Sequence, residues 1–172
     1  MLLGGARSGK SALAVRLAEE HGAPVTFLAT GQAGDEEMAE RIRRHREERP
    51  SEWTTVEEPL ELLATIERVR GSDTLVIDCL SLWVANVLER EGGDDVEDRA
   101  RRAARAAAAR SGLTLAVSNE VGLGVVPATP AGRRYRDVLG RVNSIWAAEA
   151  EKTALVVAGR ALRLDPPEQA LR

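Results

Sequence analysis

The chain has 172 residues and a formal net charge of −3, with 44% apolar and 30% charged residues. This length suits one domain over residues 1–172, and the composition excludes a disordered chain and a strongly basic nucleic-acid-binding protein. The single cysteine, Cys79, excludes an internal disulfide, and no secretory or membrane-length apolar segment is found, so we expect a cytoplasmic protein without a membrane anchor. The two histidines lack zinc-type spacing, so the metal we expect is Mg²⁺ that arrives with a nucleotide.

The first predicted strand runs into a glycine-rich segment, Gly4-Gly5-Ala6-Arg7-Ser8-Gly9-Lys10-Ser11. The segment fits the pattern GxxxxGK(S/T), in which the backbone N–H groups of a turn between strand and helix hold phosphate oxygens. Lys10 is expected to reach the outer phosphates, and Ser11 to offer its hydroxyl to Mg²⁺. A plain small-residue turn is the alternative, but only two of the 24 Lys and Arg residues are lysines, and Lys10 is one of them. We therefore predict a phosphate site.

A buried strand over residues 24–30 and a loop over 30–34 complete a βαβ unit, and a helix is predicted over residues 35–48. Acidic residues begin this helix, basic residues end it, and Pro50 stops it. Met38, Ile42 and His45 have the spacing i, i+4, i+7, so we expect the imidazole to point inward on a buried face.

His45 has two interpretations. It is a structural histidine whose ring nitrogens are satisfied by its neighbours, or it is a nucleophile. Five arginines surround it in the sequence, and their positive charge disfavours the imidazolium and favours a neutral, nucleophilic ring. Guanidinium groups also hold polyphosphates, so attack on phosphorus is chemically reasonable here. The arginines are Arg41, Arg43, Arg44, Arg46 and Arg49.

The middle of the chain continues the alternation with a strand over residues 53–56, a helix over 60–69, a strand over 74–78 and a helix over 80–88. Asp78 ends the third of these elements, where P-loop proteins keep the carboxylate that handles Mg²⁺. A simple cap for the following helix is the alternative for this acid.

The remaining elements are a helix over residues 99–110, strands over 113–118, 153–158 and 159–164, a long helix over 132–152, and a frayed tail from Pro166. The helix over residues 99–110 holds five Arg and seven Ala, and we expect it to be solvated. Because aromatic residues for base stacking are missing, we expect no nucleic-acid partner. Alternating strands and helices predict a mostly parallel α/β sheet covered on both faces, with its site along the carboxyl ends of the strands.

Four ordered segments are more particular than a general phosphate-loop protein: GGARSGKS, ATGQAGDEEMAERIRRHREERPSEWTTVE, VIDCLSLWVAN and SNEVGLGVVPATPAGRRYRDVLGRVN. Together they closely resemble the bifunctional adenosylcobinamide kinase and adenosylcobinamide-phosphate guanylyltransferase family of cobalamin biosynthesis. The resemblance spans about the whole chain, and the second and fourth segments are far more specific than the phosphate loop.

The resemblance implies a P-loop NTPase (RecA-like) three-layer fold and a homotrimer with sites near the subunit boundaries. It also implies that ATP or GTP phosphorylates the corrinoid adenosylcobinamide, and that GMP from GTP then passes to the product through a guanylyl-histidine at His45. It implies catalytic roles for His45, Lys10 and Asp78, and Mg²⁺ contacts for Ser11 and Asp78. At the position of Asp78, relatives often carry Glu. The implied GTP contacts are Gly4, Gly5, Ala6, Arg7, Ser8, Gly9, Lys10, Ser11, Ala29, Thr30, Gly31, Arg46, Glu47, Glu48, Arg49, Glu57 and Asp78.

Two other functions stay open on the residues alone. The first is a plain small-molecule kinase in which His45 is structural, and the second is a nucleotide-sensing module without turnover. The combination of Lys10, Ser11 and Asp78 speaks against the second. Corrinoid recognition is expected near the loop over residues 119–127 and the cluster Arg133, Arg134 and Arg136.

Overall fold

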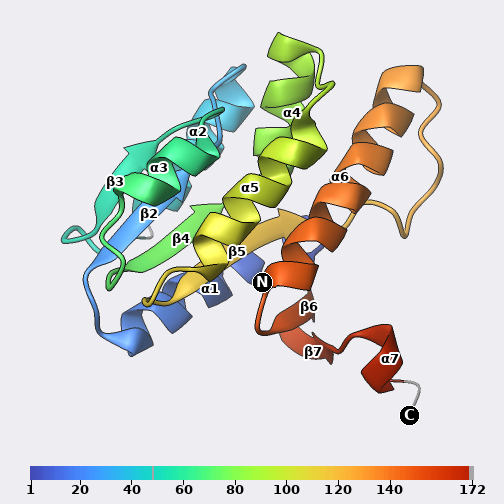
Figure 1. Cartoon of the computed structure of the whole chain (residues 1–172). Helices are drawn as coiled ribbons and strands as arrows, with labels where there is room; N and C mark the ends of the chain where they lie inside the picture. Colours follow the sequence, from blue (N-terminus) through green and yellow to red (C-terminus); the bar gives the residue numbers. More distant parts are fainter. Residues whose placement is uncertain (48, 171–172) are drawn as a thin grey trace.

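The computed structural model describes residues 1–47 and 49–170 and is built around a seven-stranded sheet in the order β3-β2-β4-β5-β1-β6-β7 (Figure 1). Neighbouring strands are parallel except β6 and β7, which pair antiparallel at one edge. The predicted mostly parallel sheet is therefore confirmed. The strands are β1 (Leu2–Gly4), β2 (Val25–Ala29), β3 (Thr54–Glu57), β4 (Thr74–Asp78), β5 (Thr114–Asn119), β6 (Thr153–Val157) and β7 (Arg160–Leu164).

Helices cover both faces of the sheet, but unequally (Figure 1). One face is covered by α1 (Lys10–His21), and the other by α3 (Leu62–Arg68), α4 (Leu80–Glu91), α5 (Val96–Ala108) and α6 (Pro130–Glu149). Helix α2 (Glu36–Glu47) lies outside these layers, beside the carboxyl ends of the strands. The tail predicted to fray instead forms a short helix, α7 (Pro167–Ala170), which begins at the second of two prolines because proline suits the first helical position.

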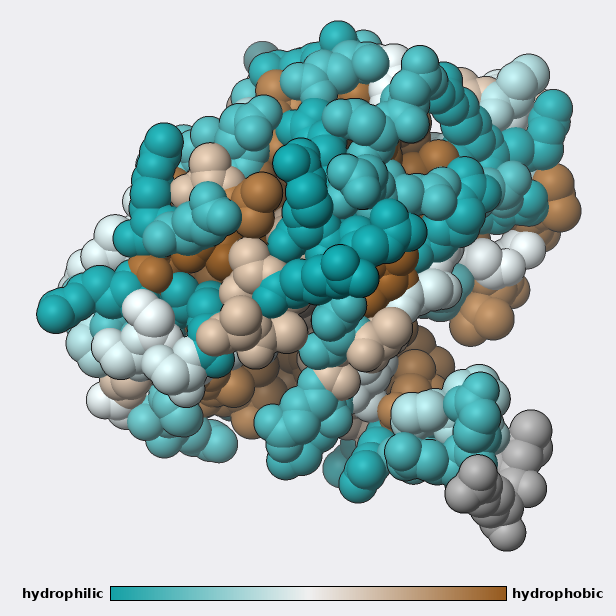
Figure 2. Space-filling view, in the orientation of Figure 1, coloured by the Kyte–Doolittle hydropathy of each residue, from teal (hydrophilic) through white to brown (hydrophobic). Residues whose placement is uncertain are grey.

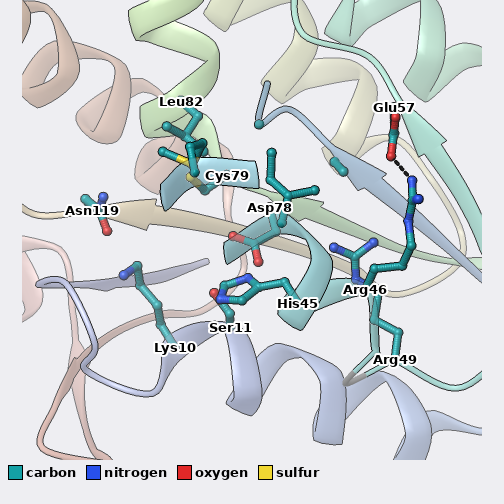
Figure 3. A pocket seen from close by; sticks show the side chains of 14 residues that line it. Lys10, Ser11, His45, Arg46, Arg49, Glu57, Asp78, Cys79, Leu82 and Asn119 are labelled. Carbon is teal, nitrogen blue, oxygen red and sulfur yellow. Dashed lines mark hydrogen bonds and ion pairs between the residues drawn. The ribbon is translucent and has the colours of Figure 1, made fainter. Parts of the chain in front are cut away.

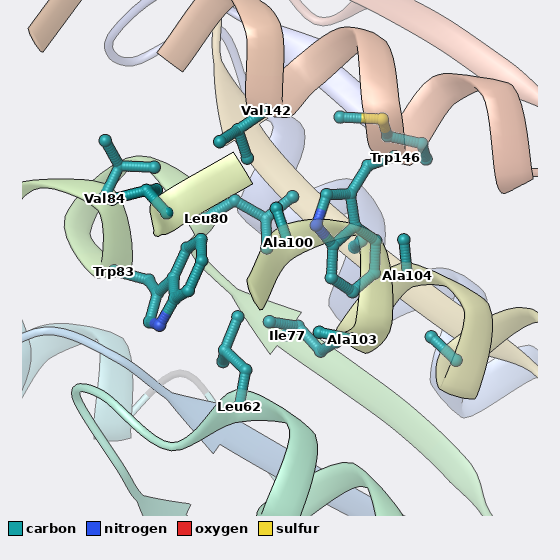
Figure 4. Packing of buried hydrophobic residues seen from close by; sticks show 14 of the residues in the cluster. Leu62, Ile77, Leu80, Trp83, Val84, Ala100, Ala103, Ala104, Val142 and Trp146 are labelled. Carbon is teal, nitrogen blue, oxygen red and sulfur yellow. The ribbon is translucent and has the colours of Figure 1, made fainter. Parts of the chain in front are cut away.

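Alternate residues of the central strands supply two separate hydrophobic cores. On β4, Leu75 and Ile77 pack under α3 to α6, whereas Val76 packs under α1. This period of two is the one that a strand covered on both faces requires. The larger core contains two indoles, Trp83 and Trp146, set among small side chains of α5 and α6 (Figure 4).

Helix α5 differs from the predicted solvated helix. Its alanines at 100, 103, 104 and 107 are buried against α3 and α6, and only its arginine-rich face is open to water. Small alanine side chains let neighbouring helices approach closely. The alanines of this segment therefore serve helix packing, while its arginines face water. Arg99 is itself mostly buried, where it donates to the Leu60 carbonyl oxygen at 2.9 Å and pairs with Glu61 and Glu91.

The visible surface over these helices is mostly hydrophilic (Figure 2). No helix in the described part of the chain combines the length and the apolar character that crossing a membrane demands.

Strand register brings the ends of four strands to one edge of the sheet, although Asp78 at the end of β4 pairs with Val117, two residues before β5 ends. Ala29 at the end of β2 is paired with Asp78 at the end of β4, and Gly4 at the end of β1 is paired with Asn119 at the end of β5. Ligands of open parallel sheets bind beyond the carboxyl ends of the strands, and β1 and β4 contribute the glycine turn and the acid to this one edge.

Candidate active site

The glycine turn joins β1 to α1, as its sequence predicts. Gly9 stands at the helix N-cap with φ 95°, a left-handed conformation that suits glycine. The Lys10 ammonium folds back to donate to the Gly5 carbonyl oxygen at 3.0 Å, and its side chain is largely buried. Among the described residues the buried Ser8 hydroxyl finds no hydrogen-bond partner. An unsatisfied buried hydroxyl beside the N-terminus of a helix fits a phosphate oxygen.

Gly4 leaves no room for a side chain. A Cβ there would collide with the Val156 carbonyl oxygen and lie 2.7 Å from Ser8 Oγ, whereas one at Gly5 would meet nothing within 4 Å. We expect Gly4→Ala to lower the free energy of unfolding by about 1–3 kcal/mol and to weaken GTP binding, because backbone atoms of β6 must move. Thermal unfolding with and without GTP measures both effects. Gly5→Ala is the matched control for stability, and an equal loss of stability in the two variants would contradict the steric argument.

A cavity of about 90 Å³ opens beside this turn. It brings together Lys10 and Ser11 from α1, His45 from α2 and Asp78 from β4 (Figure 3). They come from three segments that are far apart in the chain, and the sheet register and α2 place them around one space. The lining residues are Lys10, Ser11, Ala29, Gly31, Met38, Ile42, His45, Arg46, Arg49, Glu57, Asp78, Cys79, Leu82 and Asn119.

The face of α2 that carries His45 points into this cavity and not into a core. Met38, Ile42 and His45 are each half-buried and all three line the cavity, and neither hydrophobic core contains the first two. The period predicted from the sequence is confirmed. What this face packs against differs from the expectation. Helix α2 lies over the cavity, beyond the ends of the strands, and not on the sheet.

Most of the described arginine side chains near His45 are paired with acids, and the side chain of Arg41 lies outside the described part of the chain. Arg43 pairs with Glu40 at 2.7 Å and with Glu47, and it is exposed. Two arginines reach the cavity: Arg46, which pairs with Glu57, and Arg49, whose guanidinium carbon lies 3.6 Å from the Phe27 ring centroid. Arg44 is exposed and lies 3.7 Å from Glu40.

The other expected nucleotide contacts lie in different places relative to the cavity. Ala29, Gly31 and Glu57 line the cavity, and Gly4 to Gly9 form the turn just before it. Glu47 lies outside the lining, on the exposed side of α2 with Arg43, and Glu48 falls outside the described residues. Thr30 is completely buried behind the cavity wall.

Comparison with known proteins shows which family the chain resembles. The family model for cobinamide kinase / cobinamide phosphate guanyltransferase matches residues 1–164. The chain belongs to this family. Among its relatives is the bifunctional adenosylcobalamin biosynthesis protein CobP of Pseudomonas aeruginosa, 43% identical over 92% of both chains. The CobU proteins of Salmonella typhimurium and Escherichia coli are 34% and 35% identical over 95% of this chain and 98% of theirs.

A solved structure of an ATPase from the type III secretion system of pathogenic bacteria shares the fold, with a TM-score of 0.56 and 12% identity. The match covers 97% of this chain and 58% of that one. At this identity the likeness concerns the fold alone, and it supports the predicted α/β P-loop architecture.

Cys79 is a buried thiol in the wall of the cavity. Burial, together with the adjacent Asp78 carboxylate, raises the pKa of Cys79 to about 11. The thiolate fraction at pH 8 is therefore about 100-fold below that of an ordinary cysteine. We expect iodoacetamide to alkylate the folded protein at least about 100-fold more slowly than the urea-unfolded chain. Mass spectrometry follows the rate, and equal rates would show that the thiol is accessible.

Sequence reasoning missed several residues of the site. Leu82 and Cys79 line the cavity, and Asn86 lies behind it, where it donates to the Thr30 and Pro59 carbonyl oxygens at 2.8 and 3.2 Å. The sequence indicated only that Cys79 has no disulfide partner in the chain and that Leu82 lies in a helix. The polar Asn86 inside an otherwise apolar helix was the available signal, since such a side chain needs partners.

Proposed function

We propose that this protein phosphorylates adenosylcobinamide and then transfers GMP from GTP to the resulting phosphate through a covalent guanylyl-His45. One observation carries the proposal: the imidazole of His45 borders the same cavity as Lys10 and Ser11 of the phosphate loop. A structural histidine has no need to share a cavity with a phosphate loop, whereas a nucleophile must lie near the phosphorus that it attacks.

In the kinase step, the phosphate loop holds the triphosphate and the hydroxyl oxygen of adenosylcobinamide attacks the γ-phosphorus. A new oxygen–phosphorus bond forms, the bond between the γ-phosphorus and the β–γ bridging oxygen breaks, and the hydroxyl proton is released. Lys10, at the N-terminus of α1, neutralises the negative charge that develops on the phosphoryl oxygens. Its ammonium is positioned by a hydrogen bond to the Gly5 carbonyl oxygen.

In the transfer step, a ring nitrogen of His45 attacks the α-phosphorus of GTP. The nitrogen–phosphorus bond forms as the bond to the α–β bridging oxygen breaks, and pyrophosphate leaves with the electron pair. A phosphate oxygen of adenosylcobinamide phosphate then attacks the same phosphorus, and the bond to the histidine breaks. Arg46 and Arg49, both at the cavity, hold the departing and incoming phosphates.

The oxygen ligands that Mg²⁺ prefers are present at the cavity. Ser11 supplies a hydroxyl and Asp78 a carboxylate, and both line the cavity. Within the described residues no group of three or more His, Cys, Asp or Glu forms a metal site, which fits an ion held partly by nucleotide phosphates. When bound, Mg²⁺ supplies charge neutralisation on the phosphates.

The cavity volume suits part of a nucleotide. Sites that enclose a whole small-molecule ligand measure roughly 300–1,000 Å³, against about 90 Å³ here. We infer that the phosphates enter the cavity while the guanosine and the corrinoid lie outside its mouth.

An assay with two labels tests the proposal. With GTP labelled at the γ-phosphate, label should pass to adenosylcobinamide. With GTP labelled at the α-phosphate, label should pass to the protein as an acid-labile, base-stable adduct and then to the corrinoid. Phosphorylation without any α-label transfer would favour the plain kinase, and absence of both transfers would favour the sensing module.

We further propose that the enzyme is a cytoplasmic homotrimer. Three large apolar side chains in the loop after β5 support an interface between copies, because Leu123, Val125 and Val126 are 83%, 95% and 61% exposed. Sedimentation equilibrium of the purified protein measures the mass, and a monomer at micromolar concentration would contradict the trimer.

A further inference from the structure

Thr30 is hydrogen-bonded, through both its hydroxyl and its backbone N–H, to the segment that carries Asp78. Its hydroxyl donates to the Cys79 carbonyl oxygen at 2.7 Å and accepts from the Cys79 N–H at 2.9 Å. Its own N–H donates to the Asp78 carbonyl oxygen at 3.2 Å. One buried residue thus fixes the backbone immediately after the Asp78 side chain, from the Asp78 carbonyl group to the Cys79 carbonyl group.

Asn86 of α4 extends this arrangement to a third segment. Its amide donates to the carbonyl oxygens of Thr30 and Pro59, at 2.8 and 3.2 Å. The N–H of Glu58 donates in turn to the Ala29 carbonyl oxygen at 3.0 Å. The ends of β2, β3 and β4 are therefore joined directly behind the cavity wall.

Thr30 is poorly placed to contact a nucleotide with its own side chain. The residue is completely buried, and its neighbours Ala29 and Gly31 line the cavity while Thr30 does not. A hydroxyl has one hydrogen to donate, and here Cys79 accepts it. The expected GTP contact at this position is replaced by contacts with the protein itself.

We propose that Thr30, supported by Asn86, is a positioning residue that holds the Asp78 carboxylate where Mg²⁺ is bound. The inference rests on the metal role given to Asp78 in the proposed function. A carboxylate attached to a backbone fixed by three hydrogen bonds keeps its place when the ion and nucleotide arrive. Partners behind a metal ligand commonly change metal affinity by about 10–100-fold when they are removed.

The test compares nucleotide affinity with and without metal. Equilibrium dialysis measures binding of the α,β-methylene analogue of GTP, which cannot pass its nucleotidyl group to His45, in Mg²⁺ and in EDTA. Thr30→Val should lower the gain in affinity due to Mg²⁺ by about tenfold, and leave affinity in EDTA within about twofold. Thr30→Ser, which keeps the hydroxyl, should behave as the parent protein.

Two further variants complete the design. Thr74→Val is the matched control, because Thr74 is equally buried at the opposite end of β4 and its hydroxyl has no partner among the described residues. Asp78→Asn should lose the increase in affinity for the GTP analogue that Mg²⁺ gives to the parent protein. If Thr30→Val does not fold, Asn86→Ser replaces it, with an expected loss of at least about threefold.

The outcomes separate the two proposals. If Asp78→Asn loses the gain and Thr30→Val retains it, the positioning role is wrong and the metal role of Asp78 stands. If Asp78→Asn retains the gain, the metal role is wrong and the positioning role falls with it. A loss shared by Thr30→Ser would also overturn the inference, since the hydroxyl would not be the group that matters.

Discussion

Replacing His45 by alanine is expected to abolish transfer of GMP while leaving phosphorylation of adenosylcobinamide within a few-fold of the parent rate. The imidazole is the proposed nucleophile, and the loss of such a group commonly costs at least about 10³-fold in rate. Phosphoryl transfer depends instead on the phosphate loop, which the substitution does not touch. Incubation with α-labelled GTP followed by precipitation of the protein measures the covalent adduct, and the γ-label measures the kinase step.

The chain offers one matched control for this variant, because it has only one other histidine. His21 is exposed in the last turn of α1, and His21→Ala should retain both activities. The half-buried position of His45 keeps the cost in stability small, which thermal unfolding checks. Equal labelling of His45→Ala and the parent protein would show that another residue carries GMP, and would return the histidine to its structural interpretation.

Replacing Lys10 by methionine is expected to lower both activities by about 10²–10³-fold. Methionine keeps most of the buried stem of the side chain but removes the ammonium that neutralises phosphate charge. Both half-reactions use the triphosphate in the same loop, so a common loss distinguishes this variant from His45→Ala. Steady-state rates of phosphoryl transfer and pyrophosphate release, each at saturating GTP, give the two numbers.

Lys152 provides the comparison for charge alone. It is exposed, its Nζ lies 3.7 Å from Glu151, and it is the only other lysine. Lys152→Met removes the same charge far from the glycine turn in sequence and should leave both rates unchanged. If Lys10→Met reduced one rate only, the two reactions would not share the phosphate loop, and the single-cavity mechanism would be wrong.

Local chemistry made the phosphate loop and the helical face of α2 predictable. The turn needs glycine at Gly9 for its left-handed conformation, and this requirement is visible in a short sequence window. The i, i+4, i+7 spacing of Met38, Ile42 and His45 depends only on helix geometry, so the shared face was predicted correctly.

Predictions that depended on distant partners fared less well. Arg46 beside His45 pairs with Glu57 of β3, a partner eleven residues away that the sequence around the histidine did not indicate. The alanines of α5 were assigned to a solvated helix, although α3 and α6 bury them. In both cases the residue type was compatible with two environments, and a sequence window does not contain the segment that decides between them.

The sequence by itself determined the order of strands and helices, the phosphate loop, the face that carries His45 and the family to which the chain belongs. Only the tertiary structure decided that Lys10, His45 and Asp78 border one cavity, and that Thr30 is occupied by Cys79 and not open to a ligand. The physical reason is that hydrogen bonding and hydrophobic periodicity within an element are local. Which strand ends meet is determined by sheet register, which follows from packing of the whole chain.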